Sequence, residues 1–166
     1  MDQAQGAIDA ARAAGADEYA TAEYTAATTA LRNAHDAVVA GDYRLALNYA
    51  LESREHGQNA ARDTADTKAR MRSDLEHALA ELDALVAQGQ VRITAAERAR
   101  VPQRLLQQPA ADLSLAIDDV QKARAVVAAG DYLRASEALD GMKPRIEKVL
   151  AAIGAATSAQ SARRRR

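Results

Sequence analysis

Apolar side chains recur every three or four residues along most of this chain, the spacing that places them on one face of an α-helix. The stripe over residues 132–153 is the most regular, with steps of three and four throughout. The shorter stripe over residues 3–14 stops before Gly15, and glycine is suited to ending a helix. Stripes of this kind cover residues 3–14, 21–40, 43–87, 110–129 and 132–153. The pattern predicts an all-α fold.

One short phrase, ending in Gly-Asp-Tyr, occurs twice, at residues 38–43 and 127–132. In each copy the glycine can take the left-handed conformation that ends one helix, and the aspartate can cap the next. The tyrosine then begins the next stripe and is expected to be buried between the diverging helices. The residues predicted to form the two turns are Gly41, Asp42, Tyr43, Gly130, Asp131 and Tyr132. The duplication predicts an elongated antiparallel helical bundle, built from two helical hairpins that share one long central helix.

The middle of the long central helix lacks large apolar side chains between residues 52 and 70. Small residues keep the helical spacing there instead. They are Ser53, Gly57, Ala60, Thr64 and Thr67. Either another helix packs very closely on this face, or the stretch bridges two end clusters in solvent. Because small side chains admit a second backbone closely, we predict these five residues as a possible interaction face.

Glycine, proline and capping residues predict where the helices begin and end. Thr21 is expected to cap one helix, and Gly89 to end the long one. The segment Thr94–Glu97 matches a capping box and predicts a new helix start. Pro109 is expected to separate that short helix from the next, and a break is expected near Gly141 to Pro144. We therefore predict one domain over residues 1–154, with halves at about 4–88 and 94–153, and a disordered basic tail at 155–166.

The charge distribution narrows the possible partners. The chain has 22 basic and 23 acidic residues, and four of the basic ones form the terminal run Arg163, Arg164, Arg165 and Arg166. The rest of the chain is therefore mildly acidic and has no basic stripe, which argues against a nucleic-acid partner. The arginine run could make a weak contact with an anionic surface. No stretch is apolar enough for a transmembrane segment.

Residues for catalysis or metal binding do not form a recognisable set. The chain has no cysteine. Its histidines, His35, His56 and His77, are too far apart along a helix for one metal site, because helical zinc ligands lie three or four residues apart. Adjacent carboxylates such as Asp118 and Asp119 point to different sides of a helix. We predict no catalytic, cofactor-binding or metal-binding residue, no cofactor, and no enzyme activity.

Residues 4–70 resemble a known bacterial family. The resemblance lies in Ala7–Ala11, Gly15–Ala20, Ala22–Tyr24 and the Gly41–Tyr43 turn, followed by an alanine-rich charged helix. The segment is similar to the cell-envelope family called domain of unknown function 4398, and more weakly to tetratricopeptide helical hairpins. The resemblance implies an exported lipoprotein or periplasmic protein without catalytic residues. The location is expected to be periplasmic or in the cell envelope if an export signal has been removed, and cytoplasmic otherwise.

The scaffold suggests two uses. The first is a non-enzymatic helical scaffold or protein-protein interaction module, which binds a protein partner or a copy of itself along the face of small residues. The second is a carrier that holds a lipid or another apolar ligand between its helices, because an alanine-rich core leaves room for a cavity.

Overall fold

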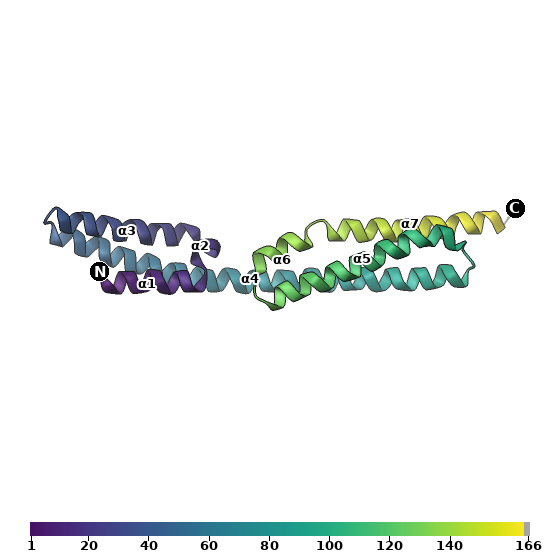
Figure 1. Ribbon diagram of the computed structural model, residues 1–166, viewed down its shortest axis with the longest axis horizontal. Helices are drawn as coiled ribbons and strands as arrows, with labels where there is room; N and C mark the ends of the chain where they lie inside the picture. Colours follow the sequence, from purple (N-terminus) through teal and green to yellow (C-terminus); the bar gives the residue numbers. More distant parts are fainter. Residues whose placement is uncertain (165–166) are drawn as a thin grey trace. The chain divides into compact units, whose positions relative to one another are not determined.

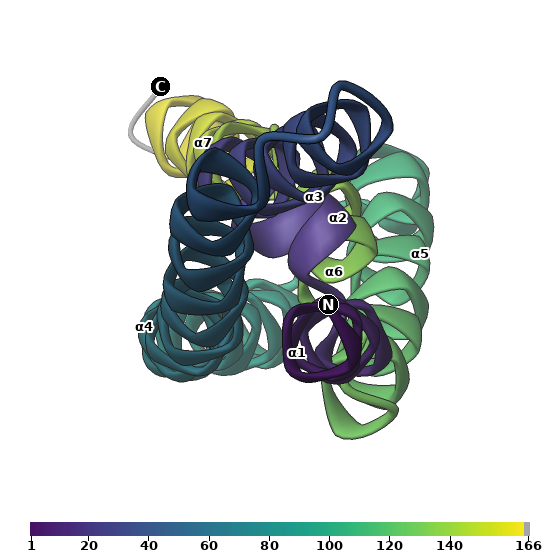
Figure 2. The same cartoon turned by 90° about the vertical axis from the view of Figure 1, so that its left-hand side faces the viewer.

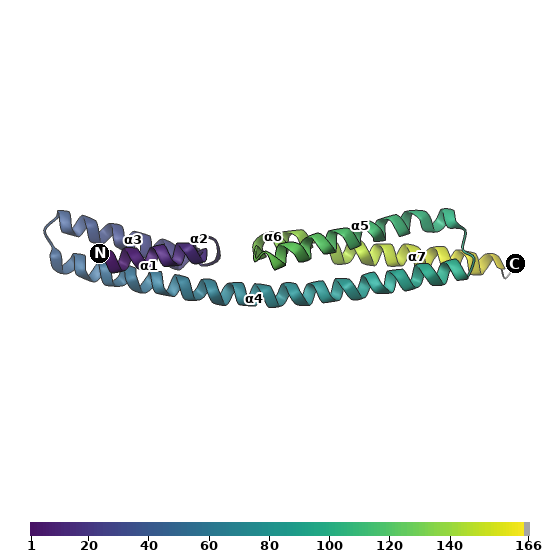
Figure 3. The same ribbon diagram turned by 60° about the horizontal axis from the view of Figure 1, so that its bottom comes forward.

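The computed structural model describes residues 1–164, which form seven helices and no strand (Figure 1). The predicted all-α class is confirmed. The helices are α1 (Asp2–Ala14), α2 (Ala16–Tyr19), α3 (Thr21–Val39), α4 (Tyr43–Arg98), α5 (Gln103–Ala128), α6 (Tyr132–Leu139) and α7 (Met142–Arg164). The long central helix predicted from the sequence is α4, which is one uninterrupted helix (Figure 3).

The helices pack into two units, Met1–Met71 and Arg72–Arg166. The division falls within α4, where the packing residues change. Before Met71 the buried positions of α4 are small, whereas Leu75, Leu79 and Leu82 are buried after it. The first unit therefore depends on close backbone approach, and the second on a leucine core.

The first unit contains α1, α2, α3 and the beginning of α4. Figure 2 views it from the turn between α3 and α4, and α1 lies to one side of that hairpin. Ala4 and Ile8 of α1 pack against Ala27 and Leu31 of α3. Gly15 ends α1 with a φ of 92°, as its position after the stripe predicts.

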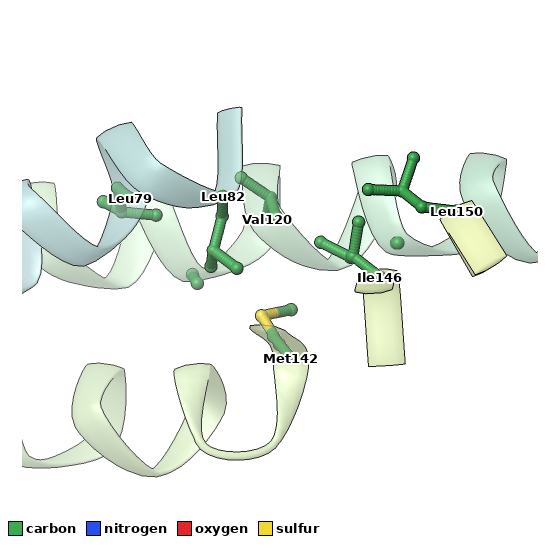
Figure 4. Packing of buried hydrophobic residues seen from close by; sticks show 8 residues of the cluster. Leu79, Leu82, Val120, Met142, Ile146 and Leu150 are labelled. Atoms are coloured by element: carbon green, nitrogen blue, oxygen red, sulfur yellow. The ribbon is translucent and has the colours of Figure 1, made fainter. Parts of the chain in front are cut away.

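The second unit has the larger apolar core. Leu79 and Leu82 of α4 meet Val120 of α5 and Met142 and Ile146 of α7, all of them buried (Figure 4). Ile146 is 0% exposed, and its side chain lies near that of Val120 in Figure 4. These contacts position α5, α6 and α7 on the end of α4.

The end of α4 lies further along the chain than predicted. Gly89 is inside the helix, and a Cβ added there would lie 2.8 Å from Cδ2 of Leu113. The glycine thus allows α5 to approach α4 and does not make a turn. Thr94 is also inside α4, where its hydroxyl donates to the Gln90 carbonyl, so the predicted capping box is wrong. The chain reverses between Ala99 and Pro102.

Three further boundaries differ from expectation. Helix α5 continues through Pro109, so this proline separates no elements. Helix α3 begins at Thr21 itself, with Ala20 in the capping position and no side-chain cap. Residues 155–164 are part of α7 rather than a disordered tail, whereas Arg165 and Arg166 lie outside the described residues. The expected break near Pro144 is present as the gap between α6 and α7.

Candidate functional site

Both Gly-Asp-Tyr segments lie between two helices. Gly41 and Gly130 have φ angles of 76° and 83°, the left-handed conformation that glycine adopts without strain. A carboxylate oxygen of Asp42 accepts the Leu45 amide at 2.9 Å, and one of Asp131 accepts the Arg134 amide at 3.2 Å. Each aspartate thereby satisfies one of the free amides at the start of the following helix.

The two tyrosines of these turns have different surroundings. Tyr132 is half-buried, whereas Tyr43 is 72% exposed. The expectation that Tyr43 begins a buried stripe is wrong. The inner face of the α3–α4 hairpin carries Ala37, Ala46 and Ala50, and alanines leave too little space for a phenol ring between the helices.

The predicted interaction face is buried within the first unit. Ser53 and Ala60 are 0% exposed and Thr64 is 1% exposed, while Thr67 is half-buried. The Ser53 hydroxyl donates to the Ala27 carbonyl of α3 at 2.8 Å. On the adjacent side, a Cβ added at Gly57 would lie 3.0 Å from the backbone carbon of Ala7 in α1. The close-packing alternative is therefore correct, but the helices that pack there are α1 and α3 of the same chain.

Lys68 of α4 holds the end of α1. Its ammonium group donates to the Ala14 carbonyl at 2.6 Å and lies 4.7 Å from the ring centroid of Tyr19. The carbonyl belongs to the last turn of α1, where the helix leaves carbonyls without intrahelical partners. One cation thus satisfies a helix end and covers an aromatic face.

Replacing Lys68 with methionine is expected to lower the free energy of unfolding by about 1 kcal/mol, because the carbonyl hydrogen bond and the cation–π contact are lost while the apolar stem remains. Urea unfolding followed by circular dichroism measures the change. The matched control is Arg62→Met, which removes an exposed cation from the same helix. An equal loss in both variants would contradict the role assigned to Lys68.

Exposed apolar side chains gather where α3 meets α4. Val39 is 89% exposed, Leu47 59% and Leu51 49%. We call the set Val38, Val39, Tyr43, Leu47 and Leu51 the tip surface. In Figure 1 this end of the hairpin extends beyond the N-terminus of α1, so here α3 and α4 have only each other. In α5 and α6, by comparison, the large exposed apolar residues are Leu105, Leu115 and Leu133.

The tip surface continues the face on which α1 packs. Val38 lies about two helical turns beyond Leu31, a residue of α3 that contacts α1. Leu47 lies about two turns before Arg54, whose guanidinium donates to the Gln3 side chain of α1 at 2.9 Å. The same side of the hairpin is thus covered by a helix along one part and uncovered at the tip.

The second unit contains two open grooves with charged rims. One, of about 380 Å3, lies between α5, α6 and α7 and contains Asp119, Lys122 and Arg145. The Asp119 carboxylate accepts from Arg145 at 2.8 Å and from Lys122 at 3.1 Å, and these bonds hold the pKa of that carboxyl below its usual range. The other groove, of about 500 Å3, has Leu79 and Val127 in its wall.

The Asp119 ion pairs predict an acid-dependent stability. Because the folded state lowers the pKa of this carboxyl, its contribution is present above the ordinary value of 3.8 and is lost as the pH falls through the lower folded value. We expect Asp119→Asn to reduce the fall in urea midpoint between about pH 5 and pH 3. Asp118→Asn, at the exposed neighbouring position, is the control. Identical pH profiles of wild type and Asp119→Asn would contradict this role.

The histidines do not come together. His56 pairs with Glu23 of α3, with 2.8 Å between Nδ1 and Oε2, whereas His35 and His77 are exposed. Across residues 1–164, no three His, Cys, Asp or Glu side chains are grouped closely enough to hold a metal ion. Within the same residues no helix has the length and apolarity needed to cross a membrane.

A family model described as "Domain of unknown function (DUF4398)" matches residues 1–76. The match agrees with the resemblance seen in the sequence and contains the whole first unit. No curated protein and no solved structure matches the chain.

Proposed function

We propose that this protein, whose residues 1–76 form a DUF4398 domain, is a non-enzymatic interaction module of the cell envelope that binds a protein helix through its tip surface. One observation carries the proposal: several large apolar side chains remain in solvent at a single hairpin end. Such gathered exposure is typical of a contact site, whereas single exposed apolar residues are common on any protein. The envelope location depends on the family resemblance alone.

The way α1 packs supports a helix as the bound element. Ala4 and Ile8 of α1 lie against the hairpin at helical spacing, and a Cβ at Gly57 would touch the α1 backbone. Val38 and Leu47 extend this same face. A second helix with apolar residues every three or four positions would bury them in the same manner.

The alternative of an apolar-ligand carrier has less support. Both grooves of the second unit are open and have charged residues in their rims, among them Arg134 and Arg145 in one and Arg72 and Arg124 in the other. A site for a lipid chain favours an enclosed apolar lining instead. We therefore favour the interaction module.

Site-specific photo-crosslinking in the cells that produce the protein tests the proposal. A photoreactive amino acid replaces Leu47, and in a control it replaces Leu115 of α5, which has a similar exposed fraction of 53%. We expect a protein adduct from position 47 and none from position 115. Absence of an adduct at 47, or equal adducts at both positions, would refute a binding role for the tip surface.

A further inference from the structure

The tip surface carries a charge pattern that points to its partner. Tyr43, Leu47 and Leu51 follow one another at intervals of four residues and form one stripe along α4. The residue after each of them is polar and exposed: Arg44, Asn48 and Glu52. The stripe thus has a positive end, a neutral centre and a negative end, and the ion pairs of residues 1–164 include neither Arg44 nor Glu52.

We infer that the partner is a second copy of this chain, whose α4 lies antiparallel on the stripe about a two-fold axis at Leu47. In this arrangement Leu47 meets Leu47 of the second copy, and Tyr43 meets Leu51 of the second copy. Arg44 then lies beside Glu52 of the second copy, twice, and the two Asn48 side chains face each other. A parallel arrangement would instead place Arg44 of one copy and Glu52 of the other on opposite sides of the stripe and about 12 Å apart along the helix axis, so these ion pairs could not form.

The length of uncovered helix fits this arrangement. Ala7 of α1 lies beside Gly57, and Gln3 bonds to Arg54, so α1 begins near the turn of α4 that follows Leu51. The segment from Tyr43 to Leu51 is therefore free to accept another helix. Pairing it with itself about Leu47 uses this segment alone and ends where α1 begins. An isologous contact of this kind is complete in a dimer and does not continue into a filament.

The inference rests on the proposed function and specifies its partner. The full chain is measured by sedimentation equilibrium over a range of concentrations. We expect a monomer–dimer equilibrium in the wild type. We expect Leu47→Glu to weaken dimerisation at least about tenfold, since each dimer contains this residue twice at its axis. Leu115→Glu, which places the same charge on a similarly exposed leucine of α5, should leave the dissociation constant unchanged.

A charge exchange tests the antiparallel direction. Arg44→Glu places two glutamates side by side at each end of the stripe and should weaken the dimer. Adding Glu52→Arg to this variant restores opposite charges and should recover the wild-type dissociation constant, a coupling that a general loss of stability does not produce. All four substituted positions, 44, 47, 52 and 115, are exposed, and circular dichroism checks that each variant remains helical.

The outcomes separate this inference from the function on which it rests. A wild-type chain that remains monomeric at all concentrations refutes the second copy as partner, and so does a dimer that ignores Leu47→Glu or the charge exchange. If the photoreactive group at position 47 then captures a different protein, the interaction function stands with another partner. If it captures nothing, both are refuted.

Discussion

Replacing Gly57 with leucine is expected to lower the free energy of unfolding by about 3 kcal/mol, because the side chain has no space between α4 and α1. Even a single Cβ at this position would lie 3.0 Å from the Ala7 carbon and 3.2 Å from the Ile8 nitrogen, both of them backbone atoms. A backbone cannot move aside as the end of a side chain can. Helix α1 must separate from α4, and the burial of Ala4 and Ile8 is lost with it.

Urea unfolding measures this loss, and hydrogen exchange of the α1 amides locates it. The control is Gly6→Leu on α1, where an added Cβ meets no atom within 4 Å. That substitution replaces a poor helix former at an exposed position and should raise stability by up to about 1 kcal/mol. Similar effects of the two substitutions would contradict the close approach of α1 to Gly57.

Truncation of Ile146 to alanine is expected to cost about 3 kcal/mol, through lost burial and the cavity that it leaves. Ile146 is 0% exposed and lies among Leu82, Val120 and Leu150, which come from three helices. Ile146→Val should cost about 1 kcal/mol in the same urea experiment. Val91→Ala, at a position that is 68% exposed, should change stability by less than about 0.5 kcal/mol. A cost below 1 kcal/mol for Ile146→Ala would contradict its place in the core.

Helical periodicity was sufficient to predict the class of the fold and several helix ends. The stripe that stops at Gly15 and the two Gly-Asp-Tyr phrases are local signals, since glycine conformation and aspartate capping depend on a few neighbouring residues. The structure has the left-handed glycines and the capping aspartates at those positions. Such ends require no knowledge of tertiary packing.

The role of the other glycines depends on contacts that the local sequence does not contain. Gly89 has the sequence context of a helix end, yet it lies inside α4 because Leu113 packs against it. Gly57 and its small neighbours indicate a close approach but not which helix approaches. That helix is α1, from the beginning of the same chain. Because the local sequence does not identify α1 as the helix that approaches, the small residues predicted to contact a partner are buried within the chain instead.

The tip surface was missed because its residues fit the helical stripe. Leu47 and Leu51 have the spacing of core residues, and their exposure follows from where α1 begins on the hairpin. One signal was present in the sequence: Tyr43, Leu47 and Leu51 repeat at steps of four, alongside the alanines that face α3. Two adjacent stripes on one helix indicate contacts on two sides.

Helix α1 covers the small residues of α4 at Gly57 within one chain, and the proposed role of the tip surface depends on this contact. The chain has no cysteine, so an introduced pair reports this contact directly. In Ala7→Cys/Gly57→Cys the two Cβ positions are 3.0 Å apart, within a small shift of disulfide geometry. Oxidation in dilute solution should give an intramolecular disulfide in a monomer, and Gly6→Cys/Gly57→Cys should stay reduced. A 7/57 pair that remains reduced, or that links only separate chains, would contradict the account.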